Sequence, residues 1–193
     1  MKLRITITLV LTSLVAGVGL ASAQSDGFGQ LDTVYAEVNR IDELNWTVNV
    51  SYVNDENVVG LTLPLKLDAG PDNRVVADSA IFTGGRVEHF TYKAFRADTA
   101  DQCVTMGLIA NWGPTSKTLK PGRGRVVTVF VSSLNDKPIE ALTVDTTTTH
   151  PHNSLQVVAD RVQGGNGEPP DTLNLSNQRL REIRPAFVIR AQD

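Results

Sequence analysis

The segment from Asn45 to Asp68 constrains the fold of this chain most strongly, because it holds two consecutive stretches of alternating polarity. Apolar side chains occupy every second position from Trp46 to Tyr52, and again from Val59 to Leu67. Successive side chains of a strand point to opposite faces, so each stretch predicts a strand with one apolar and one polar face. Two such faces must cover each other or a similar face, which predicts stacked sheets.

The first 23 residues have the pattern of a secretion signal. Lys2 and Arg4 precede an apolar run from Ile5 to Leu20, and the small residues from Ala21 to Ala23 offer a cleavage site. A membrane anchor is the alternative, but the run is short and is interrupted by threonines and a serine. We therefore expect a secreted protein, extracellular or periplasmic.

The chain after this segment is expected to be a single domain. We assign residues 1–23 to the signal peptide, 24–31 to a flexible leader and 32–191 to one β-sandwich domain. Cleavage removes two of the 18 basic residues and none of the 21 acidic ones, which leaves a net charge of about −5. Such a chain is a poor nucleic-acid binder, and it contains no second apolar stretch of membrane length.

The single cysteine, Cys103, excludes an internal disulfide. We interpret it as a buried structural thiol, with an intermolecular disulfide as the alternative and a reactive nucleophile as the least favoured role. The stability of an exported domain must then come from its hydrophobic core.

Further strands follow from the pattern of apolar residues. Val126 to Val131 is almost wholly apolar, which is typical of a central strand covered on both faces. Pro64 cannot donate to a ladder, so we expect its strand to lie at an edge or to bulge there. Residues 94–100 could form a loop or one helical turn, and residues 173–183 show weak helical periodicity. The other predicted strands are residues 32–39, 74–78, 80–83, 87–92, 103–110, 141–147, 154–158 and 186–190.

The order of these strands and turns is similar to that of the cohesin-like domains of secreted bacterial proteins. The resemblance rests on five segments, which together span most of the chain after the signal. They are Trp46–Asn54, Val59–Asp68, Ala80–Gly84, Leu119–Val131 and Phe187–Ile189. It implies an all-β, two-sheet antiparallel β-sandwich with jelly-roll topology.

The resemblance also implies a function. Cohesins bind a calcium-loaded dockerin through one sheet face, so it implies an exported, non-catalytic binding or assembly module. Its partner would be a dockerin-like protein or a cell-surface component. Related carbohydrate-binding sandwiches would give a similar pattern, so a module that recognises polysaccharide is the alternative. The segment Asp55–Asn57 lacks the Gly and the distal Glu of a dockerin-type calcium loop, and we expect neither a metal nor a cofactor.

No pattern in the sequence predicts catalysis. Glu37, Glu88 and Glu140 are isolated, and no convincing strand holds the closely spaced carboxylate pair of a glycosidase. There is no Gly-x-Ser-x-Gly elbow, and the pair His150 and His152 has no evident third ligand for a metal. We predict that the chain is not an enzyme, with a secreted hydrolase as a remote alternative.

Three aromatic residues, Trp112, Phe90 and Tyr92, are the candidates for ligand contact. Trp46 lies on the apolar face of its strand and is expected in the core. Trp112 lies in a loop, and Phe90 and Tyr92 are expected to share a strand face that could form a shallow platform. Flat rings of this kind stack on sugars, so these three residues carry the polysaccharide alternative.

Overall fold

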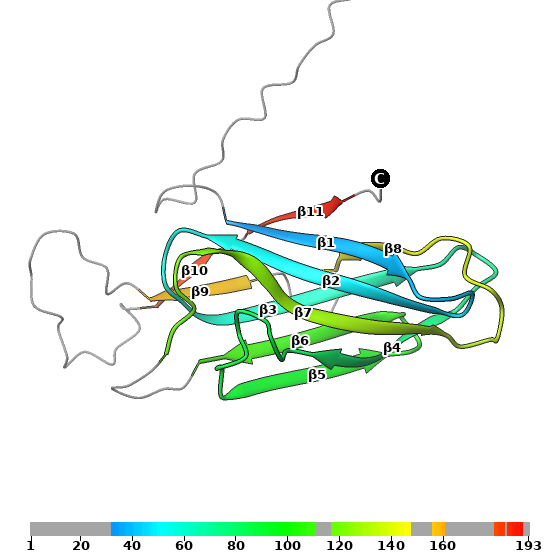
Figure 1. Ribbon diagram of the computed structural model, residues 1–193, viewed down its shortest axis with the longest axis horizontal. Helices are drawn as coiled ribbons and strands as arrows, with labels where there is room; N and C mark the ends of the chain where they lie inside the picture. Colours follow the sequence, from blue (N-terminus) through cyan, green and yellow to red (C-terminus); the bar gives the residue numbers. More distant parts are fainter. Residues whose placement is uncertain (1–31, 111–116, 148–155, 161–179, 184, 191–193) are drawn as a thin grey trace, which may run out of the picture.

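The computed structural model describes residues 32–110, 117–147, 156–160, 180–183 and 185–190, whose strands form two facing sheets (Figure 1). The β1 sheet has the order β11 (Ala186–Arg190), β1 (Thr33–Arg40), β2 (Asn45–Asn54), β7 (Gly122–Ser133), β4 (Val75–Ile81). The β3 sheet has the order β10 (Leu180–Ile183), β9 (Gln156–Asp160), β3 (Val58–Asp68), β6 (Cys103–Ile109), β5 (Tyr92–Asp98), and β8 (Thr143–Thr146) also pairs with β3. The predicted signal peptide and leader, residues 1–31, lie outside the described residues.

The predicted two-sheet β-sandwich is confirmed. The chain changes sheet after β2, β3, β4, β6, β7 and β10, and such repeated crossing agrees with a jelly roll. Pairing is antiparallel throughout the described strands except between β1 and β11, which run parallel. No helix among the described residues is long and apolar enough to span a membrane.

The core fills the space between the two sheets, and β2 shows why the sequence forms it. Trp46 is 6% exposed, as predicted for a core residue, while Val48, Val50 and Tyr52 are fully buried. Their neighbours on the polar side stay half-buried, so the alternation from Asn45 to Tyr52 matches the strand residue by residue. Burying each large apolar side chain stabilises the fold by about 1.5–3 kcal/mol, and this term has to replace disulfides here.

Two predictions about the positions of strands within the sheets have different outcomes. The strand β7 lies between β2 and β4, which confirms the central position of its apolar run. The prediction that Pro64 lies at an edge or a bulge is wrong, because β3 pairs with β6 along one side without a break at Pro64 ↔ Thr105. On its other side β9 ends at Thr62 and β8 begins at Leu65. Pro64 therefore occupies the interval between two partners, where the ladder needs no donor.

The predicted strand at residues 87–92 is also wrong. Val87 and Phe90 are both buried, at a spacing of three residues rather than two. The amide of Phe90 donates to the carbonyl of Val87 at 2.9 Å, so the segment is a turn. The strand β5 follows at Tyr92–Asp98, so most of the segment 94–100 is neither the loop nor the helical turn that the sequence left open. Residues 180–183, at the end of the weakly helical segment, form the strand β10.

The turn between β1 and β2 is organised by Asp42. Its carboxylate accepts hydrogen bonds from the amides of Leu44 and Asn45, both at 2.8 Å, and from the side chain of Asn45. The side-chain bond from Asn45 and the backbone bond from Leu44 hold the pKa of Asp42 below its ordinary value. The short connection fixes the register in which Thr33 pairs with Val53.

Candidate functional site

The outer surface of β5, β6 and β3 is flat, and we call it the flat face. Because Leu61, Leu63 and Leu65 are buried in the core, the alternate residues of β3 point outward. The register then aligns the outward residues of the three strands in four rows. The rows are Tyr92–Ile109–Gly60, Ala94–Gly107–Thr62, Arg96–Thr105–Pro64 and Asp98–Cys103–Lys66.

The two middle rows make the face flat because all of their side chains except that of Arg96 are small. Ala94, Gly107 and Thr62 form one row, and Thr105 and Pro64 lie beside each other in the next. A Cβ atom added at Gly107 would meet only the Cβ of Ala94, at 3.9 Å, so the space above this glycine is open. A partner can therefore approach the backbone of β6 closely.

Larger and charged groups border the small residues. Tyr92 is 55% exposed at one end of the flat face, and Arg96 is also exposed. At the other end, the ammonium group of Lys66 donates a hydrogen bond to the carbonyl of Asp101. Cys103 lies in the same row as Lys66 but is only 4% exposed. Burial raises the pKa of its thiol, so it is protonated at neutral pH, in agreement with the predicted structural role.

The outer surface of the β1 sheet has a different character. Asn49 on β2 accepts a hydrogen bond from Thr128 on β7 at 2.7 Å, and Thr128 accepts one from Arg125 at 2.8 Å. The guanidinium group of Arg123 lies over the ring of Tyr35, 5.8 Å from its centroid. These polar side chains stand above the sheet and bond to one another, so this surface is neither flat nor apolar.

The three predicted ligand-contact residues have separate outcomes. Trp112 lies outside the described residues. Phe90 is 2% exposed and belongs to the core, so the prediction that it shares a platform with Tyr92 is wrong. The reason is the turn before β5, which directs Phe90 inward while Tyr92 begins the strand on the outer side. The contact role of Tyr92 stays a prediction.

Sequence reasoning missed the flat face altogether. Its small residues come from three strands, and only the register brings Gly107 beside Ala94 and Thr62. A signal was present in β3 and β6, where small residues alternate with large core residues. The strand β5 gave no such signal, because polar and apolar residues do not alternate clearly along it.

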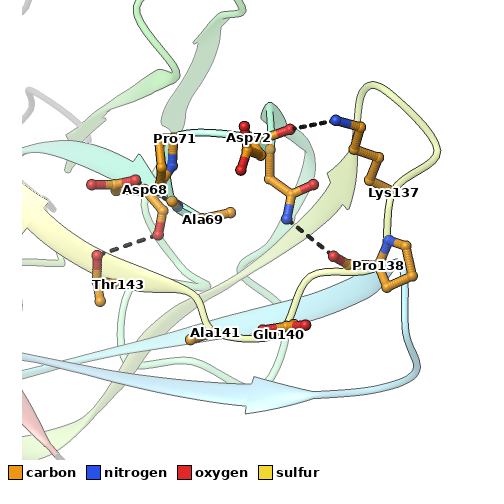
Figure 2. A pocket seen from close by; sticks show the side chains of 11 residues that line it. Asp68, Ala69, Pro71, Asp72, Lys137, Pro138, Glu140, Ala141 and Thr143 are labelled. Atoms are coloured by element: carbon orange, nitrogen blue, oxygen red, sulfur yellow. Dashed lines mark hydrogen bonds between the residues drawn. The ribbon is translucent and has the colours of Figure 1, made fainter.

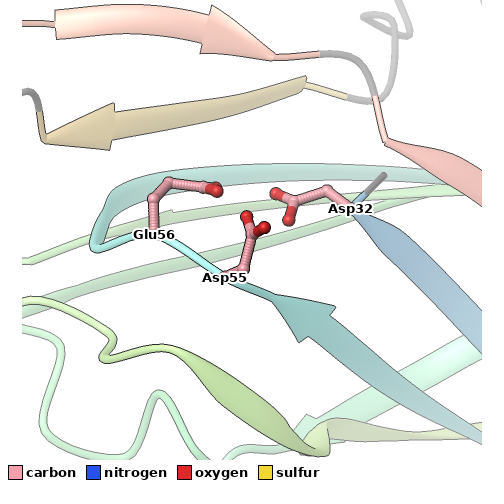
Figure 3. Close-up of side chains that lie close together, drawn as sticks. All are labelled: Asp32, Asp55 and Glu56. Carbon is pink, nitrogen blue, oxygen red and sulfur yellow. The ribbon is translucent and has the colours of Figure 1, made fainter. Parts of the chain in front are cut away.

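A second feature is a cluster of three carboxylates at one end of the sandwich, which we call the end cluster. Asp32, Asp55 and Glu56 bring their carboxylate oxygens within 4.8 Å of one another (Figure 3). Asp32 precedes β1, whereas Asp55 and Glu56 form the turn between β2 and β3. Asp32 is 1% exposed and Glu56 is 8% exposed, so two of the carboxylates are buried.

The end cluster adjoins a hydrogen-bond network around the buried side chain of Tyr52. The hydroxyl of Tyr52 donates to the carboxylate of Asp32. The guanidinium group of Arg86 donates to the carbonyls of Tyr52 at 2.9 Å, Gly122 at 3.0 Å and Lys120 at 2.5 Å. Burial lowers the pKa of Arg86, while electrostatic interactions with Tyr52 and Asp32 oppose that effect. This network ties the segment before β5 to the beginning of β7.

A third feature is a shallow hollow at the opposite end of β3 (Figure 2). It has a volume of about 660 Å³ and lies between the turn after β3 and the segment before β8. Its two sides are joined by Asn73, which donates to the carbonyl of Pro138 at 3.0 Å, and by Lys137, which donates to the carbonyl of Asp72 at 3.2 Å. The side chains of Asn73 and Lys137 therefore hold together the two turns that line the hollow.

Comparison with known proteins gives a likeness in structure alone. No family model matches this chain, and no curated protein matches it. The seventh ScaB type I cohesin from Pseudobacteroides cellulosolvens is 9% identical to this chain. The match covers 84% of this chain and 94% of the cohesin chain, with a TM-score of 0.49. In the Coh-OlpC–Doc435 complex, a type I cohesin–dockerin complex from Clostridium thermocellum, the matched chain is 9% identical, with coverages of 83% and 89% and a TM-score of 0.49.

A non-cellulosomal cohesin from the archaeon Archaeoglobus fulgidus is 11% identical, with coverages of 84% and 94% and a TM-score of 0.39. All three are cohesin structures, and the order of strands and turns in this sequence resembles that of cohesin-like domains. Their identities and TM-scores are too low to assign a family or a partner to this chain.

Proposed function

We propose that this chain is an exported, non-catalytic module that binds a protein of the dockerin class through the flat face. The observation that supports the proposal is the contrast between the two outer surfaces. The flat face presents small side chains around Gly107, whereas the opposite surface presents the bonded side chains of Asn49, Thr128 and Arg125. The resemblance to cohesins in the order of strands and turns gives the class of the partner.

The dimensions of the flat face suit a helix. Three neighbouring strands span roughly 10 Å between the outer two, and four rows of outward residues span roughly 20 Å. An α-helix with its side chains is about 10–12 Å across, so one helix can lie along the two middle rows. Tyr92 and Arg96 at the margin are of the residue types that anchor protein interfaces.

The test adds bulk to each outer surface in turn. Gly107→Leu places a side chain in the open space above β6, and the fold tolerates it because the new Cβ makes only ordinary contacts. Glu37→Leu is the matched control, since Glu37 is exposed on the outer surface of β1. A partner is first captured from the proteins exported by the source cells and identified. Its affinity for each variant is then measured by isothermal titration calorimetry.

We expect Gly107→Leu to weaken binding at least 100-fold, which corresponds to about 2.7 kcal/mol, and Glu37→Leu to change it less than threefold. Equal affinities for the two variants, or a captured partner without dockerin-like sequence, would contradict the proposal.

The second candidate function is polysaccharide binding, and the exposure of Tyr92 is the observation that favours it. Affinity electrophoresis in soluble polysaccharides separates the two functions. A sugar-binding module would migrate more slowly, and Tyr92→Ala would restore its mobility. Unretarded migration in every polysaccharide tried leaves protein binding as the supported function.

A further inference from the structure

We propose that the end cluster of Asp32, Asp55 and Glu56 is a calcium-binding site. The inference is independent of the binding function proposed for the flat face. The site differs from a dockerin-type calcium loop, because its ligands come from two separate segments of the chain rather than from one continuous loop. Only the fold brings Asp32 to the turn between β2 and β3.

The spacing of the carboxylates fits a single bound ion. Calcium binds oxygen ligands at 2.3–2.6 Å, so two oxygens on the same ion lie at most about 5 Å apart. The carboxylate oxygens of the end cluster lie within 4.8 Å of one another. Figure 3 shows the three side chains converging, with Asp55 reaching toward the space between Asp32 and Glu56. No rearrangement of the backbone is required to bring them to one ion.

The side chain of Asn54 provides an independent observation. Asn54 is 4% exposed, and its amide oxygen accepts no hydrogen bond within the described part of the chain. Continuing the β1–β2 register one residue beyond Thr33 ↔ Val53 sets Asn54 directly opposite Asp32. Both side chains then belong to the buried face of the ladder, where facing Cβ atoms lie about 4.5–5.5 Å apart.

The nitrogen of the same amide group also restricts the position of the Asn54 side chain. The amide nitrogen of Asn54 donates to the carbonyl of Glu56 at 2.5 Å, so the side chain folds over the turn that carries the cluster. A buried amide oxygen that accepts no hydrogen bond destabilises the fold, and a cation at this place would offset that cost. Asn54 therefore offers a neutral amide oxygen at the end of β2, next to the turn that carries Asp55 and Glu56.

The chemistry of these groups selects calcium. The donor set consists of oxygen atoms without imidazole or thiolate, which excludes the ligands that zinc and copper prefer. Calcium accepts six to eight oxygens in irregular geometry and fills remaining positions with water. Magnesium demands a near-ideal octahedron, and a turn with one exposed carboxylate, Asp55, does not enforce it.

A bound ion would connect three parts of the fold. Asp32 immediately precedes β1, and its carbonyl accepts a hydrogen bond from the amide of Ala186 at 2.9 Å, at the beginning of β11. Asp55 and Glu56 join β2 to β3, one strand in each sheet. Because the unfolded chain does not assemble these groups, calcium binding adds to the stability of the folded state.

The experiment measures thermal unfolding and calcium binding of the exported chain after treatment with EDTA. The informative variant is Asp55→Asn, because Asp55 is the exposed member of the cluster and its replacement leaves the core intact. Asp72→Asn is the matched control: it removes the same charge from an exposed turn at the opposite end of β3. Calcium chloride and magnesium chloride are titrated separately, and calorimetry gives the stoichiometry.

At a calcium concentration 100-fold above the Kd, we expect the wild type and Asp72→Asn to gain roughly 5–10 °C in Tm. Asp55→Asn should gain less than a third of that shift, with one ion bound per wild-type chain. In EDTA, Asp55→Asn should be at least as stable as the wild type, since it removes one of three neighbouring charges. A wild-type Tm that does not respond to calcium, or equal shifts in the two variants, would overturn the proposal.

Discussion

The guanidinium group of Arg86 is expected to hold one end of the sandwich together, and Arg86→Met tests this. Arg86 donates to the carbonyls of Tyr52, Gly122 and Lys120, at 2.5–3.0 Å. Its aliphatic carbons also pack on Gly124, where an added Cβ would lie 3.1 Å from the Cδ of Arg86. Methionine keeps much of that aliphatic contact and removes the three hydrogen bonds.

The magnitude follows from the surroundings of each bond. A hydrogen bond from a charged donor contributes about 1.5–3 kcal/mol when buried, and the bond to Tyr52 is partly buried. The bonds to Gly122 and Lys120 are exposed, so water replaces them and each contributes only about 0.5 kcal/mol. Arg86→Met should therefore lower the free energy of unfolding by about 2.5–4 kcal/mol.

The assay is urea unfolding followed by tryptophan fluorescence, with a thermal scan in parallel. A loss of this size lowers the Tm by roughly 5–15 °C for a chain of this length. Arg86→Lys should recover only part of the loss, because one ammonium group cannot span three carbonyls. Arg123→Met is the control and should cost less than about 0.5 kcal/mol. An Arg86→Met variant within 0.5 kcal/mol of the wild type would refute the reasoning.

Two further predictions concern the core and the single thiol. Leu63→Ala removes a fully buried side chain and should cost about 2–5 kcal/mol in urea unfolding, whereas Thr62→Ala on the outer side of β3 should cost less than about 1 kcal/mol; similar losses would contradict the assigned faces. Burial raises the pKa of Cys103 above its unfolded value, so its contribution to stability is complete below the unfolded pKa and is lost as the pH rises through the folded pKa. The wild type should therefore lose more stability than Cys103→Ala between pH 7 and pH 10, and parallel losses would argue against a buried thiol.

Much of the fold could be predicted from the sequence because alternation reports burial directly. From Trp46 to Tyr52 every second side chain is buried, and the final strand at Ala186–Arg190 has the predicted bounds. The alternation misled at Val59, which was assigned to the apolar face together with Leu61. A bulge between Val58 and Gly60 adds a residue, so Val58 is fully buried and Val59 is only half-buried.

The candidate sites could not be predicted in the same way, because each depends on contacts between distant segments. The flat face requires the register of β5 against β6, and β5 has no clear alternation: its inward residues Phe95 and Ala97 are only partly buried. The end cluster requires the β1–β2 register, which brings Asp32 opposite Asn54, 22 positions later in the sequence. Composition near either segment does not reveal that proximity.

The most direct test of the proposed binding function is an NMR titration of the ¹⁵N-labelled domain with its captured partner. Binding through the flat face predicts that the amides of Thr62, Ala94 and Gly107 shift most, while those of Glu37 and Asn49 on the opposite surface stay unchanged. The largest shifts at Glu37 and Asn49, with Gly107 unaffected, would contradict it.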